Sequence, residues 1–376
     1  MSKTRQFFKG QTEITKLKIK VLAKYIKGYY PKLLLSFKKC AIIDLFSGPG
    51  KSGNNLGSPL QAIEQAKYIL QSPILKNMPE TPKIYFFFND INSEYTKNLQ
   101  EELSKIQSEL PKNIIYKVTN YDYKEILPKL IQWLKENRIP SFIFLDPFTY
   151  SQISVSDLKE LIDLPHVEIM LFIPISHVYR FSGSEPLKNN EKHRTRKFLE
   201  EYTMSGVKKY KNYLELLYDI RKKLLNELRT DYVRPVLLNT GAQKNALIFI
   251  TKHRKGMILM NKTSLSLSSD GYSNISSSTN QLSLFDNTFH NTQFQNFKNS
   301  LIEKIKSCSL KTNEEIVEYT IKEGYLPKHA KEILLELFRQ NKIIFMDENG
   351  NEIRDQRKWN IAEQIKKQVI IKYHGC

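Results

Sequence analysis

Two short motifs in this sequence combine residue types that could bind a small molecule and act on it. The first is Asp44-Leu45-Phe46-Ser47-Gly48-Pro49-Gly50, which begins at the end of an apolar run typical of a buried strand. The second is Asp146-Pro147-Phe148, which follows another such run. If both runs belong to one open parallel sheet, the two motifs lie at the carboxyl ends of its strands, where such sheets bind ligands.

The glycines of the first motif would let the backbone approach a nucleotide-like ligand closely. A phosphate-binding loop would require glycine five residues before Gly50-Lys51-Ser52, and that position is Leu45. The run from Gly48 to Gly53 matches the glycines of a dinucleotide fingerprint. That fingerprint also expects an acid at a strand end roughly 20 residues after the glycines. The next acid at a strand end in this chain is Asp90, which lies well beyond that distance. Neither pattern therefore explains the motif.

Asp44 precedes the glycines, and this order favours a cationic ligand. S-adenosylmethionine carries a positive sulfonium and an amino group, for which a nearby carboxylate is favourable. The motif resembles the first motif of S-adenosylmethionine-dependent methyltransferases, particularly those acting on nucleic-acid bases. The resemblance implies that Asp44, Phe46, Gly48 and Gly50 bind this cofactor. The alternative is a tight turn between a strand and a helix.

Two further acids follow predicted strands and extend the candidate cofactor site. Asp90, in Phe87-Phe88-Asn89-Asp90, ends the second strand and would accept hydrogen bonds from the ribose hydroxyls. Asp122, in Asn120-Tyr121-Asp122-Tyr123, ends the third strand, where the adenine would lie. For each acid the alternative is an N-cap or turn role.

Asp146-Pro147-Phe148 is the candidate catalytic motif. The exocyclic amine of a base is a poor nucleophile because its lone pair is delocalised into the ring. The Asp146 carboxylate and a nearby backbone carbonyl could hold the amine and localise that lone pair, while Phe148 stacks on the base. The motif resembles the Asp-Pro-Pro-Tyr class of amino-group methyltransferases of DNA and RNA, and the Asp-Pro-Phe form of a guanine-methylating tRNA family. An ordinary Asp-Pro turn is the alternative.

Further segments extend the resemblance along most of the chain. They are Lys18 with Val21-Leu22, Gly57-Ser58-Pro59-Leu60, Ile173-Pro174 before Arg180, and Ile250-Thr251 before Gly256-Met257. The series is similar to the three-Cys-motif partner family (TcmP-type), which is methyltransferase-like and encoded beside a protein with a three-cysteine motif. The resemblance implies that such a protein is a partner. The chain departs from the family at Ile14, which is often Trp, and at Thr149, which is often Gly.

The predicted elements would bring these motifs to one edge of a sheet. Apolar runs at 41–46, 83–88, 114–118, 141–145 and 168–173 alternate with helical patterns at 58–70, 94–110, 124–137 and 155–161. This alternation predicts an α/β fold, a Rossmann-like methyltransferase sheet with helices on both faces. A basic amphipathic helix over 12–30 precedes it, and a helical insertion at about 187–228 and a strand at 246–251 follow.

The C-terminal part has a different pattern. Residues 262–298 contain nine serines, five asparagines and two acids without an apolar period, which predicts a linker or long surface loop. Helical patterns at 297–308, 313–323 and 328–340 then precede a hairpin of 342–346 and 352–354 around Asp347-Glu348-Asn349-Gly350. We therefore predict three parts: a methyltransferase-like domain at 1–261 with a helical insertion at about 181–230, a linker at 262–298, and a winged-helix domain at 299–376.

The charge favours nucleic acid as a partner. The chain has 58 lysines and arginines against 39 acids, a net charge of +19. Eleven basic residues and one acid lie in residues 1–39, and twelve basic residues and seven acids lie in 181–230, with tyrosines between the lysines. The residues that we expect to contact phosphates are Lys16, Lys18, Lys20, Lys24, Lys27, Arg180, Arg194 and Arg196. Solvated helix faces that keep the protein soluble are the alternative.

The sequence also argues against several protein classes. No apolar run approaches the roughly 20 residues that span a bilayer, so we expect no membrane partner. Cys40, Cys308 and Cys376 lack metal-ligand spacing, and the first ten residues lack the apolar run of a signal peptide. We expect a cytoplasmic protein without a metal site.

Three functions remain after these exclusions. The favoured one is an S-adenosylmethionine-dependent methyltransferase that acts on a base amino group of DNA or RNA. The alternative is a non-catalytic, methyltransferase-like subunit that recognises nucleic acid for a three-Cys-motif protein. A DNA-binding regulator led by the winged helix is weaker, because residues 299–376 carry fourteen basic residues against twelve acids.

Overall fold

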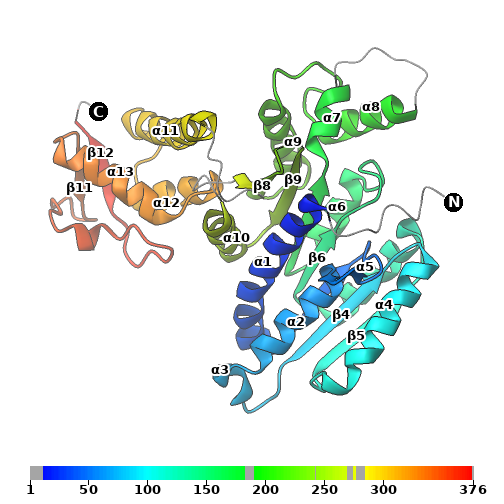
Figure 1. The fold of residues 1–376 in the computed structure, drawn as a ribbon. Coiled ribbons are helices and arrows are strands. Elements are labelled where there is room, and N and C mark those ends of the chain that lie inside the picture. The colour runs from blue at the N-terminus through cyan, green and yellow to red at the C-terminus, as the bar shows by residue number, and fades with distance from the viewer. Residues whose placement is uncertain (1–11, 183–189, 242, 269–273, 277–283, 375–376) are drawn as a thin grey trace. The chain divides into compact units, whose positions relative to one another are not determined.

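The computed structural model describes residues 12–182, 190–241, 243–268, 274–276 and 284–374 (Figure 1). Contacts divide the chain into two compact units. Unit 1 comprises Met1–Leu259 with Ile275–Ser278, and unit 2 comprises Met260–Asn274 with Thr279–Cys376. Parts of three predicted segments lie outside the described residues: 1–11 of the basic N-terminal region, 183–189 of the insertion, and 269–273 and 277–283 of the linker. Within the described part, no helix combines the length and the apolar character needed to cross a bilayer.

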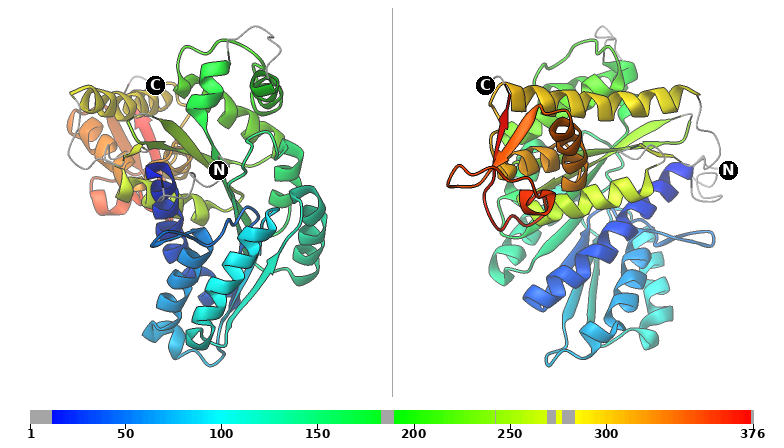
Figure 2. Two further views of the ribbon diagram at one scale, coloured as in Figure 1. Left: turned by 45° about the vertical axis from the view of Figure 1, so that its right-hand side comes forward. Right: turned by 90° about the vertical axis from the view of Figure 1, so that its left-hand side faces the viewer.

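Unit 1 is built on an eight-stranded sheet, which Figures 1 and 2 show from three directions. In spatial order its strands are β10 (Asn274–Ser276), β8 (Tyr232–Asn239), β9 (Lys244–Thr251), β7 (Val167–Ile173), β6 (Ser141–Leu145), β1 (Lys39–Asp44), β4 (Lys83–Asn89) and β5 (Ile114–Thr119). Strands β5, β4, β1, β6 and β7 run parallel, whereas β9 runs antiparallel to both β7 and β8.

The order of the parallel strands creates a switch point between β1 and β6. The chain passes from β1 to β4 and β5 on one side of the sheet, and then returns to the other side of β1 for β6 and β7. Open α/β sheets bind ligands outside the carboxyl ends of the strands at such a point. The two motifs singled out above follow β1 and β6, so the topology places both of them there.

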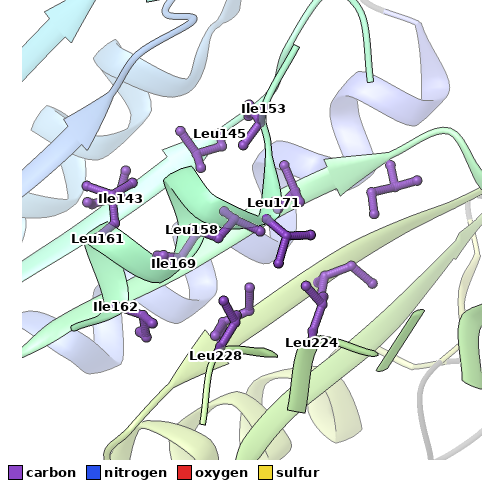
Figure 3. Packing of buried hydrophobic residues seen from close by; sticks show 14 of the residues in the cluster. Ile143, Leu145, Ile153, Leu158, Leu161, Ile162, Ile169, Leu171, Leu224 and Leu228 are labelled. Atoms are coloured by element: carbon purple, nitrogen blue, oxygen red, sulfur yellow. The ribbon is translucent and has the colours of Figure 1, made fainter. Parts of the chain in front are cut away.

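Helices cover both faces of the sheet. Odd-numbered residues of β1, β6 and β7 join the largest buried cluster, together with side chains of α5 (Tyr123–Asn137), α6 (Val155–Ile162) and α9 (Tyr213–Glu227). Figure 3 shows part of this cluster, including Ile143, Leu158 and Leu224. Alternate residues of a strand face opposite sides. The even-numbered Phe142 therefore meets α1 (Glu13–Phe37), where the Tyr25 ring lies 5.2 Å from its ring. The predicted two-sided α/β sheet is confirmed.

The remaining elements of unit 1 are short or lie around the sheet. They are β2 (Lys51–Ser52), β3 (Asn55–Leu56), α2 (Ser58–Leu70), α3 (Pro73–Lys76), α4 (Ser93–Ile106), η2 (Gln107–Glu109), α7 (Ile175–Phe181), α8 (Asn190–Tyr202) and the start of α10 (Arg254–Leu267). The sequence prediction missed the β2–β3 hairpin, α3, α7, β8, α10 and β10. Strand β8 escaped it because Pro235 interrupts its apolar run, although the strand pairs along its length with β9.

Helix α1 is longer than the sequence indicated. The apolar period predicted a helix that ends at Tyr30, directly before Pro31, which lacks a backbone N–H for a helical hydrogen bond. The helix instead continues to Phe37, and Tyr29, Tyr30 and Leu34 are all buried on its inner face. Burial of these side chains outweighs the local cost of the proline.

Unit 2 contains the predicted winged helix. Helices α11 (Leu284–Lys306), α12 (Asn313–Lys322) and α13 (Pro327–Arg339) precede β11 (Ile343–Met346), η3 (Gln356–Trp359) and β12 (Ile370–Tyr373). The turn at Asp347-Glu348-Asn349-Gly350 is present, with Gly350 at φ +83°. The predicted hairpin is present in a shortened form: Met346 and Glu352 make an antiparallel bridge, and the Ile353 N–H donates to the Phe345 carbonyl. The sequence missed β12, with which β11 pairs along its length.

The predicted linker over 262–298 is also wrong where the structure describes it, because α10 continues to Leu267 and α11 begins at Leu284. A serine is accommodated inside α10 because its hydroxyl finds a partner within the helix: Ser264 donates to the carbonyl of Met260, one turn earlier. Asn261 also anchors α10, since its amide donates to the carbonyls of Ile321 and Tyr325.

Candidate functional site

The loop after β1 is organised by Asp44, which is 2% exposed. Its Oδ1 accepts a hydrogen bond from the Phe46 backbone N–H (3.1 Å), and its Oδ2 accepts one from the Ser58 hydroxyl (2.6 Å). Ser58 is the first residue of α2. The carboxylate therefore links the end of β1 to the helix that follows the loop. Sequence analysis had quoted Ser58 only as part of a family motif and had given it no role.

The glycines allow the turn between these two anchors. Gly48 and Gly50 have φ values of +63° and +81°, in the left-handed region that L side chains rarely adopt. A Cβ on Gly50 would also lie 2.7 Å from Leu99 Cδ1. The Gly50 carbonyl accepts a hydrogen bond from the Gly57 N–H (2.6 Å), which closes the loop around the β2–β3 hairpin.

Asp90 connects the next strand to the same loop. Its Oδ2 accepts from the Gly48 N–H and its Oδ1 accepts from the Asn92 N–H, both at 2.9 Å. Each carboxylate oxygen can accept more than one hydrogen bond, so lone pairs remain on both for a ligand. The neighbouring Asn89 was missed by the sequence analysis. Its buried amide donates to the carbonyls of Leu45 and Tyr121, and so joins the loops after β1 and β5; a polar residue ending an apolar strand was the available signal.

Asp122 takes the N-cap position that was its alternative interpretation. It precedes α5, and its carboxylate accepts from the Lys124 N–H at 2.8 Å. Phe46 is half-buried, and its ring stacks on that of Tyr123 with the centroids 5.4 Å apart. The structure thus places Phe46 and Asp122 beside the start of the same helix.

Asp146 follows β6 and forms an ion pair with Lys18 of α1. The bond joins Lys18 Nζ to Asp146 Oδ2, and the two side chains are 10% and 25% exposed. The Lys18 ammonium also lies 4.1 Å from the centre of the Phe172 ring. Pro147 is buried, whereas the Phe148 side chain is 97% exposed and presents an apolar ring to solvent beside the carboxylate.

The carboxylates of the two motifs interact electrostatically. Burial raises the pKa of Asp44 to about 7, although the hydrogen bonds from Ser58 and Phe46 oppose the shift. The negative charges of Asp146 and Asp90 add to the increase. Strands β4, β1 and β6 therefore bring together three acids that were predicted separately from the sequence, with Asp90 and Asp146 both within electrostatic range of Asp44.

The predicted phosphate-contacting residues occupy different environments. Lys16, Lys20, Lys24 and Lys27 are exposed on the outer side of α1, whereas Lys18 is buried on its inner side. Lys16 pairs with Glu13 (2.8 Å), and Lys27 lies 4.8 Å from the centre of the Tyr68 ring.

Arginines predicted to contact phosphates are exposed on two other helices. Arg180 lies in the last turn of α7, and Arg194 and Arg196 lie on α8. The Arg196 Nε atom is 2.9 Å from Glu200 Oε1. The basic side chains that were predicted to contact phosphates thus come from helices α1, α7 and α8 of unit 1.

Unit 2 has a groove of its own, with a volume of about 570 Å³. Residues after β11 and before β12 line it. Two of its arginines are paired with acids, Arg354 with Glu352 and Arg357 with Asp355, while Lys358, Lys366 and Lys367 are exposed. This groove contains none of the residues of the two motifs.

A comparison with known protein families agrees with the architecture of the C-terminal part. A family model described as a GMT-like wHTH domain matches residues 272–350, which supports the winged helix. A search of curated proteins found no match.

Three solved structures are similar to this chain at low levels, and each match covers about three fifths of it. The methyltransferase domain of bacterial CtHen1-CN has 15% identity and a TM-score of 0.29, covering 61% of this chain and 98% of that one. A SAM-dependent methyltransferase from Aquifex aeolicus has 13% identity and a TM-score of 0.25, covering 60% and 89%. Geranyl diphosphate methyltransferase, solved with GPP and sinefungin, has 10% identity and a TM-score of 0.24, covering 60% and 78%. At these values the matches contribute nothing to the assignment of a ligand or a reaction.

Proposed function

We propose that this chain is an S-adenosylmethionine-dependent methyltransferase that acts on an amino group of a nucleic-acid base. The observation that carries the proposal is the meeting of two motifs at the switch point between β1 and β6. There the glycine loop, held by Asp44 and Asp90, lies beside Asp146-Pro147-Phe148. One motif suits a nucleoside cofactor, and the other suits an aromatic amine.

The residues of the loop fit the chemistry of this cofactor. Asp90 retains lone pairs toward which ribose hydroxyls could donate, and the glycine turn exposes backbone to a ligand. Asp44 supplies negative charge for the amino group and the sulfonium, and Phe46 and Asp122 flank the adenine. When bound, S-adenosylmethionine supplies a methyl group on a positively charged sulfur.

Asp146, Pro147 and Phe148 would prepare the substrate amine. Asp146 Oδ1 accepts an N–H of the amine, the Pro147 carbonyl offers a second acceptor, and the exposed Phe148 ring stacks on the base. These contacts would localise the nitrogen lone pair toward the methyl group that the bound cofactor would supply. As the nitrogen took that methyl group, the electron pair of the carbon–sulfur bond would stay on sulfur and a proton would leave the nitrogen for solvent.

Basic side chains on α1, α7 and α8 would hold the nucleic-acid backbone around this site. Phosphate contacts supply affinity and orientation without reading the sequence, which is the role that exposed lysines and arginines fit. The family resemblance adds a protein bearing a three-cysteine motif as a partner. The second candidate function, a non-catalytic recognition subunit for that partner, would use the same surface.

The decisive experiment combines the purified protein with methyl-labelled S-adenosylmethionine and separate DNA, RNA and protein fractions from cells. We expect label in a nucleic-acid fraction, released as a methylated base on digestion. Label in protein alone would contradict the substrate class. If calorimetry detects no binding of S-adenosylmethionine or its demethylated product at millimolar concentration, the non-catalytic function is supported instead.

The lysines on the outer side of α1 give a separate test of the nucleic-acid partner. Reversing Lys16, Lys20, Lys24 and Lys27 to Glu should weaken binding and flatten its salt dependence. The slope of log K against log salt changes by roughly 0.9 for each lost phosphate contact on duplex DNA, and by roughly 0.7 on single strands. Fluorescence anisotropy at several salt concentrations measures it. An unchanged slope would assign these lysines to solubility.

A further inference from the structure

The amino group of Lys18 belongs to the candidate site and not to the basic outer surface of α1. From its contacts we infer that Lys18 is a positioning residue, which holds Asp146 in place and offsets one negative charge beside the cofactor. This inference rests on the proposed function. It also separates Lys18 from the lysines with which the sequence analysis had grouped it.

The contacts of Lys18 fix both its side chain and the carboxylate. The Lys18 side chain is 10% exposed, and its ammonium requires a partner because leaving a charge unpaired at such a place is costly. Asp146 Oδ2 accepts its hydrogen bond, and the Phe172 ring lies 4.1 Å away on β7. The attraction to the Phe172 ring and the ion pair with Asp146 thus act jointly to keep the ammonium in place.

The pairing leaves one carboxylate oxygen for the substrate. Lys18 engages Oδ2, and among the described residues the structure gives Oδ1 no hydrogen bond. A carboxylate bound at one oxygen has less freedom to rotate, so Oδ1 is oriented before the amine arrives. Pre-oriented acceptors are more effective than mobile ones because their conformational entropy is already lost on folding and is not lost again when the substrate binds.

Lys18 also sets the charge of the site. Asp90 and Asp146 both act on Asp44, since their negative charges raise its pKa. Among the residues that the structure describes, Lys18 is the one basic residue that forms an ion pair with any of these three acids, and its partner is Asp146. The positive charge of Lys18 repels the sulfonium of S-adenosylmethionine. It does not repel the neutral sulfur of the demethylated product. The ratio of affinities for the two ligands therefore reports on Lys18 without requiring methyl transfer.

The experiment measures that ratio by calorimetry and the turnover with nucleic acid in the wild type and in three variants. Lys18→Met should raise the affinity ratio of S-adenosylmethionine to its product about tenfold, and Asp146→Asn should lower it about tenfold. Lys18→Met should reduce kcat about a hundredfold, and Lys18→Arg should recover part of that loss. The kcat of Lys18→Met with Asp146→Asn should be close to that of Asp146→Asn alone, because the two residues act as a unit.

Tyr25→Phe is the matched control. Tyr25 lies two turns along the same buried face of α1 and bonds a carboxylate of the sheet, Glu168. Tyr25→Phe should lower the melting temperature and leave the affinity ratio and kcat close to the wild type. If Lys18→Met does not fold alone, the double variant should still show a ratio about tenfold above that of Asp146→Asn, since both members of the pair are then neutral.

The outcomes separate this inference from the proposed function. An unchanged ratio and a kcat within threefold of wild type in Lys18→Met would overturn the positioning role while the methyltransferase stands. A wild type that binds both ligands but methylates no nucleic acid contradicts the substrate proposal, and the ratio still decides the charge argument. A wild type that binds neither ligand overturns both.

Discussion

Helix α1 contacts two carboxylates of the sheet, and the two sites differ in what surrounds them. Lys18 and Tyr25 are seven residues apart on one helical face. Lys18 meets Asp146 just beyond the carboxyl end of β6, whereas Tyr25 meets Glu168, the second residue of β7. One helix therefore contributes to the carboxyl-end site and to a site farther back along the strands.

The Glu168 site is closed. Both carboxylate oxygens accept hydrogen bonds, from the Tyr25 hydroxyl (2.5 Å) and from the Thr251 hydroxyl (3.2 Å). A Cβ on Gly256 would lie 1.9 Å from Glu168 Oε1, so the backbone of α10 covers the carboxyl directly. Burial raises the pKa of Glu168 to about 7.

The Asp146 site is open by comparison. Asp146 is paired through one oxygen, is 25% exposed, and adjoins the exposed Phe148 ring and the glycine loop of Asp44. Burial raises the pKa of both Asp44 and Glu168 to about 7, yet of these two only Asp44 lies at the switch point between β1 and β6. A buried acid with a raised pKa is therefore not by itself a sign of activity. Its place in the sheet and its remaining acceptors distinguish the two sites.

The largest expected effect contrasts Asp146 with Glu168 in catalysis. Asp146→Asn should lower single-turnover methyl transfer about a thousandfold, because the amide cannot hold the amine as the carboxylate does. Glu168→Gln should leave the rate within about threefold. Methyl transfer at the wild-type rate in Asp146→Asn would remove Asp146 from the catalytic role.

The second effect concerns stability and pH. The pKa of Glu168 in the folded protein, about 7, lies above its ordinary value of 4.5, so the native state keeps the proton longer than the unfolded chain. Its contribution to stability is complete below pH 4.5 and is lost as pH rises to about 7. The free energy of unfolding of Glu168→Gln, relative to that of the wild type, should therefore rise by about 2–3 kcal/mol from pH 5 to pH 8, as measured by urea unfolding. An equal difference at both pH values would show that Glu168 does not titrate in this range.

The smallest effect concerns the cofactor. Asp44 becomes negative as pH rises through about 7, so the affinity for cationic S-adenosylmethionine, relative to its neutral-sulfur product, should rise about tenfold from pH 6 to pH 8. Asp44→Asn should abolish this pH dependence, and Glu168→Gln should retain it.

Asp90→Ala should remove the thermal stabilisation by either ligand, since it loses the contact to Gly48 as well as the ribose acceptor. Calorimetry and thermal shifts at both pH values check these results.

Much of the fold followed from local patterns in the sequence. Apolar runs located the parallel strands, and the helical period located the helices that cover them, since both depend on neighbouring residues. The misses had long-range or competing causes. Strand β8 contains Pro235, the last turns of α10 contain Thr263, Ser264 and Ser266, and β11 pairs with β12, a strand far along the chain, as well as with the nearby return.

The position of Lys18 shows where the sequence signal was present but not used. The side chain lies between Leu17 and Val21 on the apolar face of α1, while Lys16 and Lys20 lie on the outer face. Helical periodicity alone separates these lysines into two groups. It does not say which partner a lysine on the apolar face would find.

The sequence by itself determined the chemical groups of the candidate site and their places at strand ends, because glycine turns and strand termini are local features. Only the tertiary structure decided that Asp90 bonds the Gly48 N–H and that Lys18 pairs with Asp146, 128 residues away. Those contacts depend on the order of the strands and on the register of α1 across the sheet. That register is set by the packing of α1 side chains such as Tyr25 against Phe142 and Phe249, which joins residues far apart in the chain.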